Sequence, residues 1–194
     1  MELADKVILT EWRPDWVADS ALLADALSAA LGPIALRIDH IGSTSVPGLA
    51  AKDVIDMQVI VANLDRDAII ETFTSAKFVQ KYEEWNLHDH IPAGWVGDVE
   101  QWAKLVFATP PGFRLGNVHV RVSGSPNERY ALLFRDFLTA DPGAREAWGR
   151  FKRELAATTQ TLADYGSVKD PATDVLMALA ERWAADTSWT VPKL

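Results

Sequence analysis

The first part of the chain switches from a helical spacing of hydrophobic residues to an extended one. Trp16 and Leu23 are two turns apart in a mostly apolar stripe, which predicts a helix that begins near Pro14 and ends at Gly32. Apolar and polar residues then alternate over 34–41, the pattern of a strand with one polar face.

A loop and a second extended segment follow. Residues 42–48 contain two glycines, one proline and three hydroxyl side chains, the composition of a loop. Residues 54–61 are rich in β-branched side chains and mostly apolar on both faces, which predicts a strand in the interior of a sheet.

In the rest of the chain, strand-like segments come mostly before helical ones. With few strand–helix–strand units, this order favours an α+β fold over a doubly wound parallel sheet. The elements expected here are short strands at 7–9, 78–83, 104–108 and 117–122, a loop or hairpin over 86–101, and helices after Asp65 and over 126–139, 143–160 and 170–185.

Length and composition place the chain among ordinary globular proteins. Its 194 residues, 48% of them hydrophobic, predict one domain over 1–194. The absence of cysteine excludes disulfides, thiolate catalysis, Cys-ligated zinc and iron–sulfur clusters. The longest uncharged apolar run, 26–36, is too short for a membrane span. Residues 1–6 lack a signal-peptide pattern, so we expect a cytoplasmic protein and no membrane partner.

The charge balance argues against a nucleic-acid partner. There are 19 basic and 27 acidic residues, which gives a net charge of −8. A field of this sign repels nucleic acid and anionic membranes, although a local basic groove is compatible with it.

The loop after the first predicted strand and the acid in the next strand form one candidate site. Gly42 lets backbone N–H groups approach a phosphate closely, and Ser43 and Thr44 add hydroxyl donors. Asp56, on the neighbouring strand, is placed to hold Mg²⁺ against the same phosphates. These are the components of half a phosphoryl- or nucleotidyl-transfer site.

The sequence around Gly42 matches neither common phosphate-loop motif. Five residues separate Gly42 from Gly48 and no Lys-Ser/Thr pair follows, unlike a Walker A loop, and there is no G-x-G-x-x-G. The alternative is that both glycines are turn residues in a loop fixed by Val46 and Pro47, and local chemistry leaves the two interpretations open.

Several motifs together resemble the GrpB family. The resemblance spans roughly residues 7–183, and its longest motif is the loop signature His40-Ile-Gly-Ser-Thr-Ser-Val-Pro-Gly-Leu-Ala-Ala-Lys52 with Val54-Ile-Asp56. The other motifs are Glu11-Trp-Arg-Pro-Asp-Trp16, Asn117-Val-His-Val120, Leu132-Leu-Phe-Arg-Asp-Phe-Leu138 and Phe151-Lys-Arg-Glu-Leu155. The resemblance implies a nucleotidyltransferase-like fold, in which a small mixed β-sheet is flanked by helices and the C-terminal part is helical. Members of the family also occur fused to dephospho-CoA kinase.

The family pattern assigns roles to three positions and is broken at a fourth. Gly42 and Ser43 fit its loop element, and Asp56 fits the first residue of an acid-x-acid pair. The second acid falls on Gln58, a neutral and weaker ligand for Mg²⁺. The resemblance therefore implies one Mg²⁺ held by Asp56 and a ligand phosphate rather than two bridged ions. Glu83, Glu84, Asp89 and Asp98 remain open as a third carboxylate.

Further basic residues are candidates beside this site. His119 and Arg121 share one face of the last predicted strand. Beside a phosphate site, His119 would transfer a proton and Arg121 would bind the phosphate. The alternative is that this face of the strand is exposed to solvent. Lys52 is equally a phosphate ligand or a solvated residue, and Arg135 either binds phosphate or docks its helix by pairing with Asp136.

Two weaker signals complete the candidates. GrpB proteins share a Tyr-x-x-x-Lys pattern, which makes Lys169 a further phosphate-binding candidate and a better one than Lys152. His88 and His90 have the spacing of a metal pair, but a surface loop is the favoured interpretation.

We therefore expect a GrpB-like protein that binds a nucleotide or a similar phosphorylated small molecule, with Mg²⁺ as cofactor, and that transfers a nucleotidyl group. The alternative is a non-catalytic binding module that acts with a partner such as dephospho-CoA kinase.

Overall fold

This computed structural model describes residues 5–81 and 83–194. Residues 1–4, part of the segment without a signal-peptide pattern, and residue 82, inside the strand expected over 78–83, lie outside the described residues.

A mixed five-stranded sheet forms the centre of the molecule. Its order is β1-β2-β5-β4-β3; β2 and β5 are parallel and the other neighbours are antiparallel. The sheet and its helices confirm the predicted α+β class. The strands are β1 (Arg37–Ile41), β2 (Ile55–Val61), β3 (Val79–Gln80), β4 (Leu105–Ala108) and β5 (Gly116–Val122).

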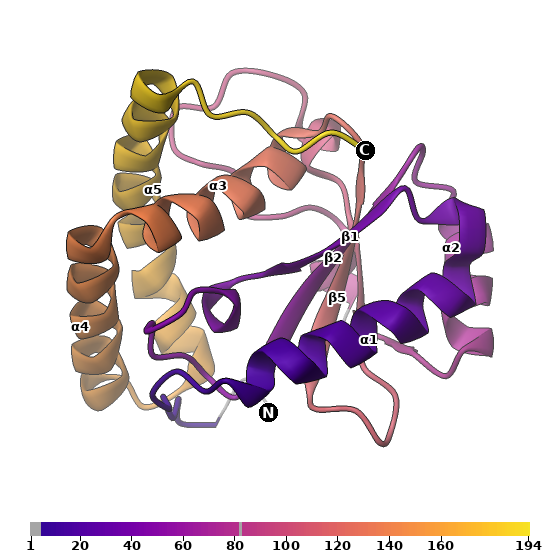
Figure 1. The fold of residues 1–194 in the computed structure, drawn as a ribbon, viewed down its shortest axis with the longest axis horizontal. Coiled ribbons are helices and arrows are strands. Elements are labelled where there is room, and N and C mark those ends of the chain that lie inside the picture. The colour runs from indigo at the N-terminus through magenta and orange to yellow at the C-terminus, as the bar shows by residue number, and fades with distance from the viewer. Residues whose placement is uncertain (1–4, 82) are drawn as a thin grey trace.

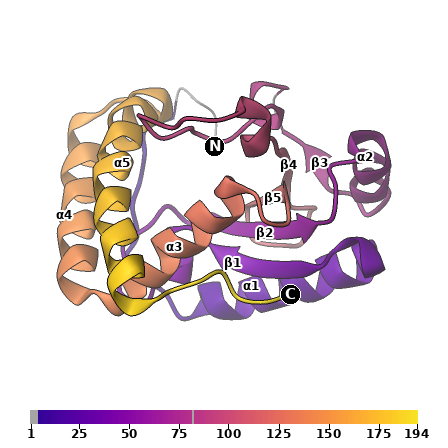
Figure 2. The same cartoon turned by 90° about the horizontal axis from the view of Figure 1, so that it is seen from above.

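Helices cover both faces of the sheet. Seen nearly edge-on in Figure 1, the sheet has α1 and α2 on one side and α3 to α5 on the other. Figure 2 shows α4 and α5 side by side at one end of the molecule. The helices are α1 (Asp15–Leu31), α2 (Arg66–Ser75), α3 (Pro126–Ala140), α4 (Pro142–Thr158) and α5 (Leu162–Thr187), with short 3₁₀ turns at Gly32–Ile34, Ser43–Ser45, Glu83–Asn86 and Val99–Trp102.

The two faces of the sheet differ in polarity because side chains alternate along each strand. Met57 and Val59 of β2 and Val118 of β5 belong to the main core, together with residues of α1 and α2. On the opposite face β2 carries Asp56 and Gln58. The expectation of a mostly apolar strand inside the sheet is confirmed for β2, with these two polar positions on one face.

A second hydrophobic core joins the C-terminal helices. Leu133 of α3, Trp148 of α4 and Met177 of α5 pack with Val46 and Leu49, which follow the glycine turn. This core holds the three helices beside the polar face of the sheet. It also holds the loop that follows the glycine turn at Gly42 against these helices.

Three expected boundaries differ from the structure. Residues 7–9 are not a strand; Val7 packs against Leu155 and Tyr165, while the nearest bridge joins Thr10 to Ala51. The strand expected over 78–83 is described only as Val79–Gln80.

The last helix starts at Leu162 and not near Pro171, which lies inside α5. Thr161 accepts a hydrogen bond from the Asp164 N–H and caps the helix there, so the cap outweighs the proline as a start signal.

The segment expected as a loop over 86–101 spans the molecule. Its residues 87–98, hereafter the crossing loop, reach from the sheet toward α5 (Figure 2), where His90 Nε2 lies 2.7 Å from Asp174 Oδ1. The Ala93 N–H donates to the other oxygen of Asp174. The crossing loop therefore connects the sheet to the helical layer.

One helix, α1, is long and apolar enough to cross a membrane by length and composition. Its residues Trp16, Leu23, Leu27 and Leu31 are buried in the main core against the sheet. Val17 and Leu22 of the same helix are exposed, so packing against the sheet accounts for only part of its apolar composition.

Candidate functional site

A cavity of about 340 Å³ lies between the polar face of the sheet and helices α3, α4 and α5. Its size falls in the range of small-molecule sites. One part of its lining is charged and includes Ser43, Lys52, Asp56, Lys152 and Lys169. Another part is aromatic and consists of Trp102, Tyr130, Phe134, Trp148 and Tyr165.

The glycine turn and the acid of β2 meet at the charged end of the cavity. Ile41, the last residue of β1, pairs with Asp56, so the chain leaves β1 directly opposite the acid. Gly42 adopts φ 73° and ψ −163°, a region that is essentially restricted to glycine. A Cβ at Gly42 would lie only 2.7 Å from Asp56 Oδ2. Glycine is therefore required both by the backbone and by the close approach of the carboxylate.

Asp56 is held ionised by its neighbours on β5. Asn117 occupies the paired position and donates from Nδ2 to Asp56 Oδ1 at 2.8 Å, and His119 Nε2 lies 3.9 Å from the same oxygen. Burial raises the pKa of Asp56, but His119, Asn117 and Lys52 outweigh it and hold that pKa below its ordinary value. Asp56 is thus a carboxylate at neutral pH.

His119 is neutral at pH 7. Burial lowers its pKa; Asp56 opposes this, but the positive charges of Arg121 and Lys104 keep the pKa below its ordinary value. A neutral imidazole at this position accepts or relays a proton and adds no positive charge to the site.

Gln58, where the family pattern has its second acid, does not line the cavity. Its side chain is fully buried; Nε2 donates to Asp39 Oδ2 at 2.9 Å, and Oε1 accepts from Arg121 NH1 at 2.8 Å. The amide bridges a carboxylate to a guanidinium, so it is a structural connector here.

Arg121 and Asp89 form a buried ion pair at the edge of the site. Arg121 Nε donates to Asp89 Oδ2 at 2.8 Å, and Lys104 Nζ donates to Oδ1 at 2.7 Å. Burial raises the pKa of Asp89, but Arg121 and Lys104 lower it far below its ordinary value. The charge of Arg121 is therefore already matched, although both Arg121 and Asp89 line the cavity.

Three lysines from different parts of the chain line the charged end. Lys152 of α4 is 3% exposed, and its Nζ donates to Ser43 Oγ at 3.0 Å. Burial, together with the charges of Lys169 and Lys52, lowers the pKa of Lys152 to about 7. Burial also lowers the pKa of Lys52, which Asp56 only partly offsets. The cluster is thus short of negative charge.

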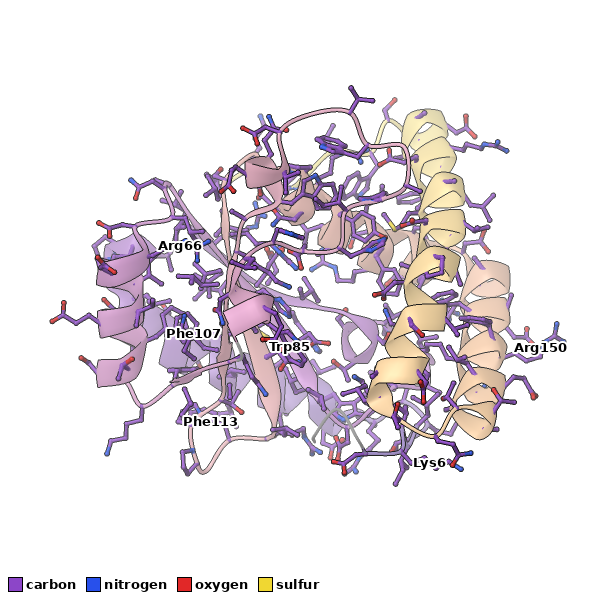
Figure 3. The ribbon with its side chains drawn as sticks, turned by 180° about the vertical axis from the view of Figure 1, so that it is seen from behind. Lys6, Arg66, Trp85, Phe107, Phe113 and Arg150 are labelled. Carbon is purple, nitrogen blue, oxygen red and sulfur yellow. The ribbon has the colours of Figure 1, made fainter. Side chains whose placement is uncertain are left out.

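The direction of Lys152 follows from the helix. Arg150, two residues earlier, points away from the body of the molecule (Figure 3), because residues two apart lie on nearly opposite sides of a helix. Lys152 instead shares a stripe with the buried Trp148 and Leu155. A lysine within an apolar helical stripe is the sequence signal for this burial.

Two other predicted phosphate ligands make contacts within the protein. Thr44 is buried, and its Oγ1 lies 2.9 Å from His40 Nε2. Burial lowers the pKa of His40 to about 4. Arg135 lies outside the cavity lining; it donates to the His40 carbonyl oxygen at 3.2 Å and to Asp136 Oδ1 at 2.7 Å. These contacts are those of the helix-docking alternative.

The histidines of the crossing loop have separate partners. His88 Nδ1 lies 2.9 Å from the Asp89 carbonyl oxygen, whereas His90 contacts Asp174. Over residues 5–81 and 83–194, no group of three or more His, Asp or Glu side chains is arranged to hold a metal ion. Of the acids left open as a third carboxylate, Asp89 lines the cavity, and the side chain of Glu83 lies outside the described part.

Four buried polar atoms in the described part of the chain have no hydrogen-bond partner. They are Trp102 Nε1, His119 Nδ1, Tyr130 Oη and Trp148 Nε1. All four residues line the cavity. The unsatisfied groups are therefore concentrated around this cavity. Each of them costs about 1–3 kcal/mol as long as it has no hydrogen-bond partner.

The motifs that form the site are those of a known family. The model of the GrpB protein family matches residues 6–178. The chain belongs to the GrpB family. It resembles the crystal structure of the conserved protein GrpB from Enterococcus faecalis with a TM-score of 0.69 and 28% identity, covering 91% of this chain and 99% of that one.

Two further comparisons concern longer proteins. A dephospho-CoA kinase of Mycolicibacterium paratuberculosis is 36% identical over 193 residues, which cover 91% of this GrpB-family chain and 46% of that protein. The chain therefore spans about half the length of that relative. The Cid1 poly(U) polymerase matches with a TM-score of 0.52 and 14% identity over 81% of this chain and 50% of that one, which shows that this chain shares its fold with part of that polymerase.

Proposed function

We propose that this GrpB-family protein binds a nucleotide or a similar phosphorylated small molecule in the cavity. The observation that carries the proposal is that Lys52, Lys152 and Lys169 line the same cavity as Ser43, with Lys152 hydrogen-bonded to Ser43. Of the two acids in the lining, Asp89 is matched by its own ion pairs, and Lys169 pairs with Asp170 at 3.2 Å. Asp56 is therefore the one acid of the lining that is left to face Lys52 and Lys152. A phosphate group with two or more negative charges complements this surplus.

A single Mg²⁺ fits the proposed site. Mg²⁺ is usually held by one or two carboxylates together with substrate phosphates and water. Asp56 is ionised and lines the cavity beside the glycine turn, so it would hold the ion, which supplies charge neutralisation for the phosphates. At the position where a two-ion site needs a second carboxylate, the chain has Gln58, whose amide is already hydrogen-bonded to Asp39 and Arg121.

Nucleotide binding is tested by calorimetric titration with ATP, GTP, CTP and UTP, with and without MgCl₂. We expect binding to wild type, at least about tenfold weaker binding to Lys152→Met, and loss of the Mg²⁺ dependence in Asp56→Ala. Arg150→Met is the matched control, since it removes a charge from the outer side of the same helix. The proposal is rejected if no nucleotide binds wild type under either condition.

Nucleotidyl transfer is the second candidate function, and the nucleotidyltransferase-like fold with Asp56 on β2 favours it. Its signature is release of pyrophosphate in the presence of an acceptor. Gln58→Asp introduces the second acid of the pattern, but its carboxylate would lie beside that of Asp39 and be repelled by it. A gain of activity in this variant indicates a decayed enzyme, and unchanged binding without activity indicates a binding module.

A third possibility is that the protein is a non-catalytic module that acts on a separate dephospho-CoA kinase. It is favoured by the relative named dephospho-CoA kinase, of which this chain covers 46%. The experiment is to add the protein to a dephospho-CoA kinase and measure complex formation and the rate of CoA synthesis. No complex and no change in rate would exclude that partner.

A further inference from the structure

Aromatic rings form a large part of the lining of the same cavity that holds the lysine cluster. Trp102 comes from the 3₁₀ turn before β4, Tyr130 from α3 and Trp148 from α4. The rings of Trp102 and Tyr130 meet edge to face, with centroids 5.9 Å apart. Aromatic faces of this kind stack planar groups without regard to their exact identity.

The same three side chains carry three of the four buried polar atoms that lack a partner. Trp102 is 2% exposed and Trp148 is 6% exposed, so neither is a surface residue. An indole N–H is a donor only and is satisfied only by an acceptor. A purely aliphatic ligand would fill the space and leave these donors unsatisfied.

We propose that this aromatic part of the lining is the subsite for a planar heteroaromatic ring that carries acceptor nitrogen or oxygen atoms, joined to the phosphates held by the lysines. This inference rests on the proposed function, because the lysine cluster supplies the anchor. It adds that ring recognition involves Tyr130 and Trp148, and that the preferred ligand is a phosphorylated heterocycle and not a phosphorylated sugar or alkyl chain.

The first experiment compares three ligands that share a phosphate group. Adenosine diphosphate, inorganic pyrophosphate and ribose 5-phosphate are titrated into the wild-type protein by calorimetry. We expect the diphosphate with the ring to bind at least about tenfold more tightly than the other two, the size of effect that stacking on aromatic side chains gives. Pyrophosphate that binds as tightly as adenosine diphosphate overturns this inference and leaves the proposed function intact. Failure of these three ligands to bind, together with failure of ATP, GTP, CTP and UTP, rejects the proposed function as well.

The second experiment removes the unpartnered donors while keeping a ring. In Tyr130→Phe and Trp148→Phe, the affinity for adenosine diphosphate is expected to fall by roughly three- to tenfold, with the affinity for pyrophosphate unchanged. Tyr130→Phe should not lower the melting temperature, because the lost hydroxyl has no partner in the folded protein.

Trp189→Phe is the matched control for these variants. Trp189 packs against the same helical core, but its Nε1 donates to Asp136 Oδ2 at 3.0 Å, outside the cavity lining. This variant should be less stable and retain the wild-type ratio of the two affinities. An unchanged ratio in both Tyr130→Phe and Trp148→Phe refutes the inference, whatever their stability.

Discussion

Lys152 of α4 donates a hydrogen bond to Ser43, 109 positions earlier in the chain. This contact joins the C-terminal helical layer to the glycine turn at the end of β1. It places a buried amine beside the residue that the loop motif marks for phosphate contact. The charged end of the cavity therefore exists only in the folded chain.

We predict that binding of a phosphorylated ligand takes up a proton. In the free protein the pKa of Lys152 is lowered to about 7, and a bound polyanion raises it by favouring the charged amine. At pH 8 the amine is mostly neutral before binding and charged after it, so affinity should fall as the pH rises above 7. Titrations in buffers of different ionisation enthalpy measure the proton uptake. Lys152→Met should reduce it; a protonation count of zero in wild type contradicts the prediction.

We predict that Gly42→Ala destabilises the protein and displaces Asp56. The backbone angles at Gly42 alone cost about 1–3 kcal/mol for alanine, and its Cβ would collide with Asp56 Oδ2. Urea unfolding of Gly42→Ala in the wild-type and Asp56→Ala backgrounds separates the two effects, since the second background lacks the collision. Gly94→Ala is the control, because Gly94 also has a positive φ but has no atom within 4 Å of an added Cβ. Equal losses at the two glycines would contradict the steric argument.

We predict that Asp89→Asn is strongly destabilising at neutral pH. Removing one partner of a buried ion pair costs about 3–5 kcal/mol, and Arg121 is 5% exposed. The pKa of Asp89 is depressed in the folded state. Its contribution to the free energy of unfolding is therefore complete above the ordinary aspartate pKa near 3.9 and is lost as the pH falls below that value. The stability difference from wild type, measured by urea unfolding, should therefore narrow from pH 7 to pH 3. Asp67→Asn on the exposed side of α2 should show little difference at either pH.

We predict that Arg135→Gln lowers stability by about 1 kcal/mol, the worth of a typical hydrogen bond, and leaves ligand affinity unchanged. The reason is that Arg135 contacts the His40 carbonyl and Asp136 and does not line the cavity. Thermal unfolding and nucleotide titration measure the two effects. A loss of affinity as large as that of Lys152→Met would restore Arg135 as a phosphate ligand.

Much of the fold was predictable from local pattern. The alternation over 34–41 and the β-branched run over 54–61 correspond to β1 and β2, and the hydrophobic periodicity located α1, α3 and α4 closely. The start of α5 was misplaced because Pro171 was read as the start of the helix, whereas the helix begins after Thr161, which caps it. The short strand expected at 7–9 failed because a few apolar residues pack equally well against helices.

The sequence by itself determined the family, the α+β order of elements and the glycine turn next to Asp56, because these depend on residues near one another in the chain. Only the tertiary structure decided which charges share the cavity. It buried Lys152 against Ser43, paired Arg121 with Asp89 and hydrogen-bonded Gln58 to Asp39. It also brought aromatic residues of four elements together around one cavity. The physical reason is that burial and electrostatic pairing depend on distances across the fold, and local sequence patterns do not contain those distances.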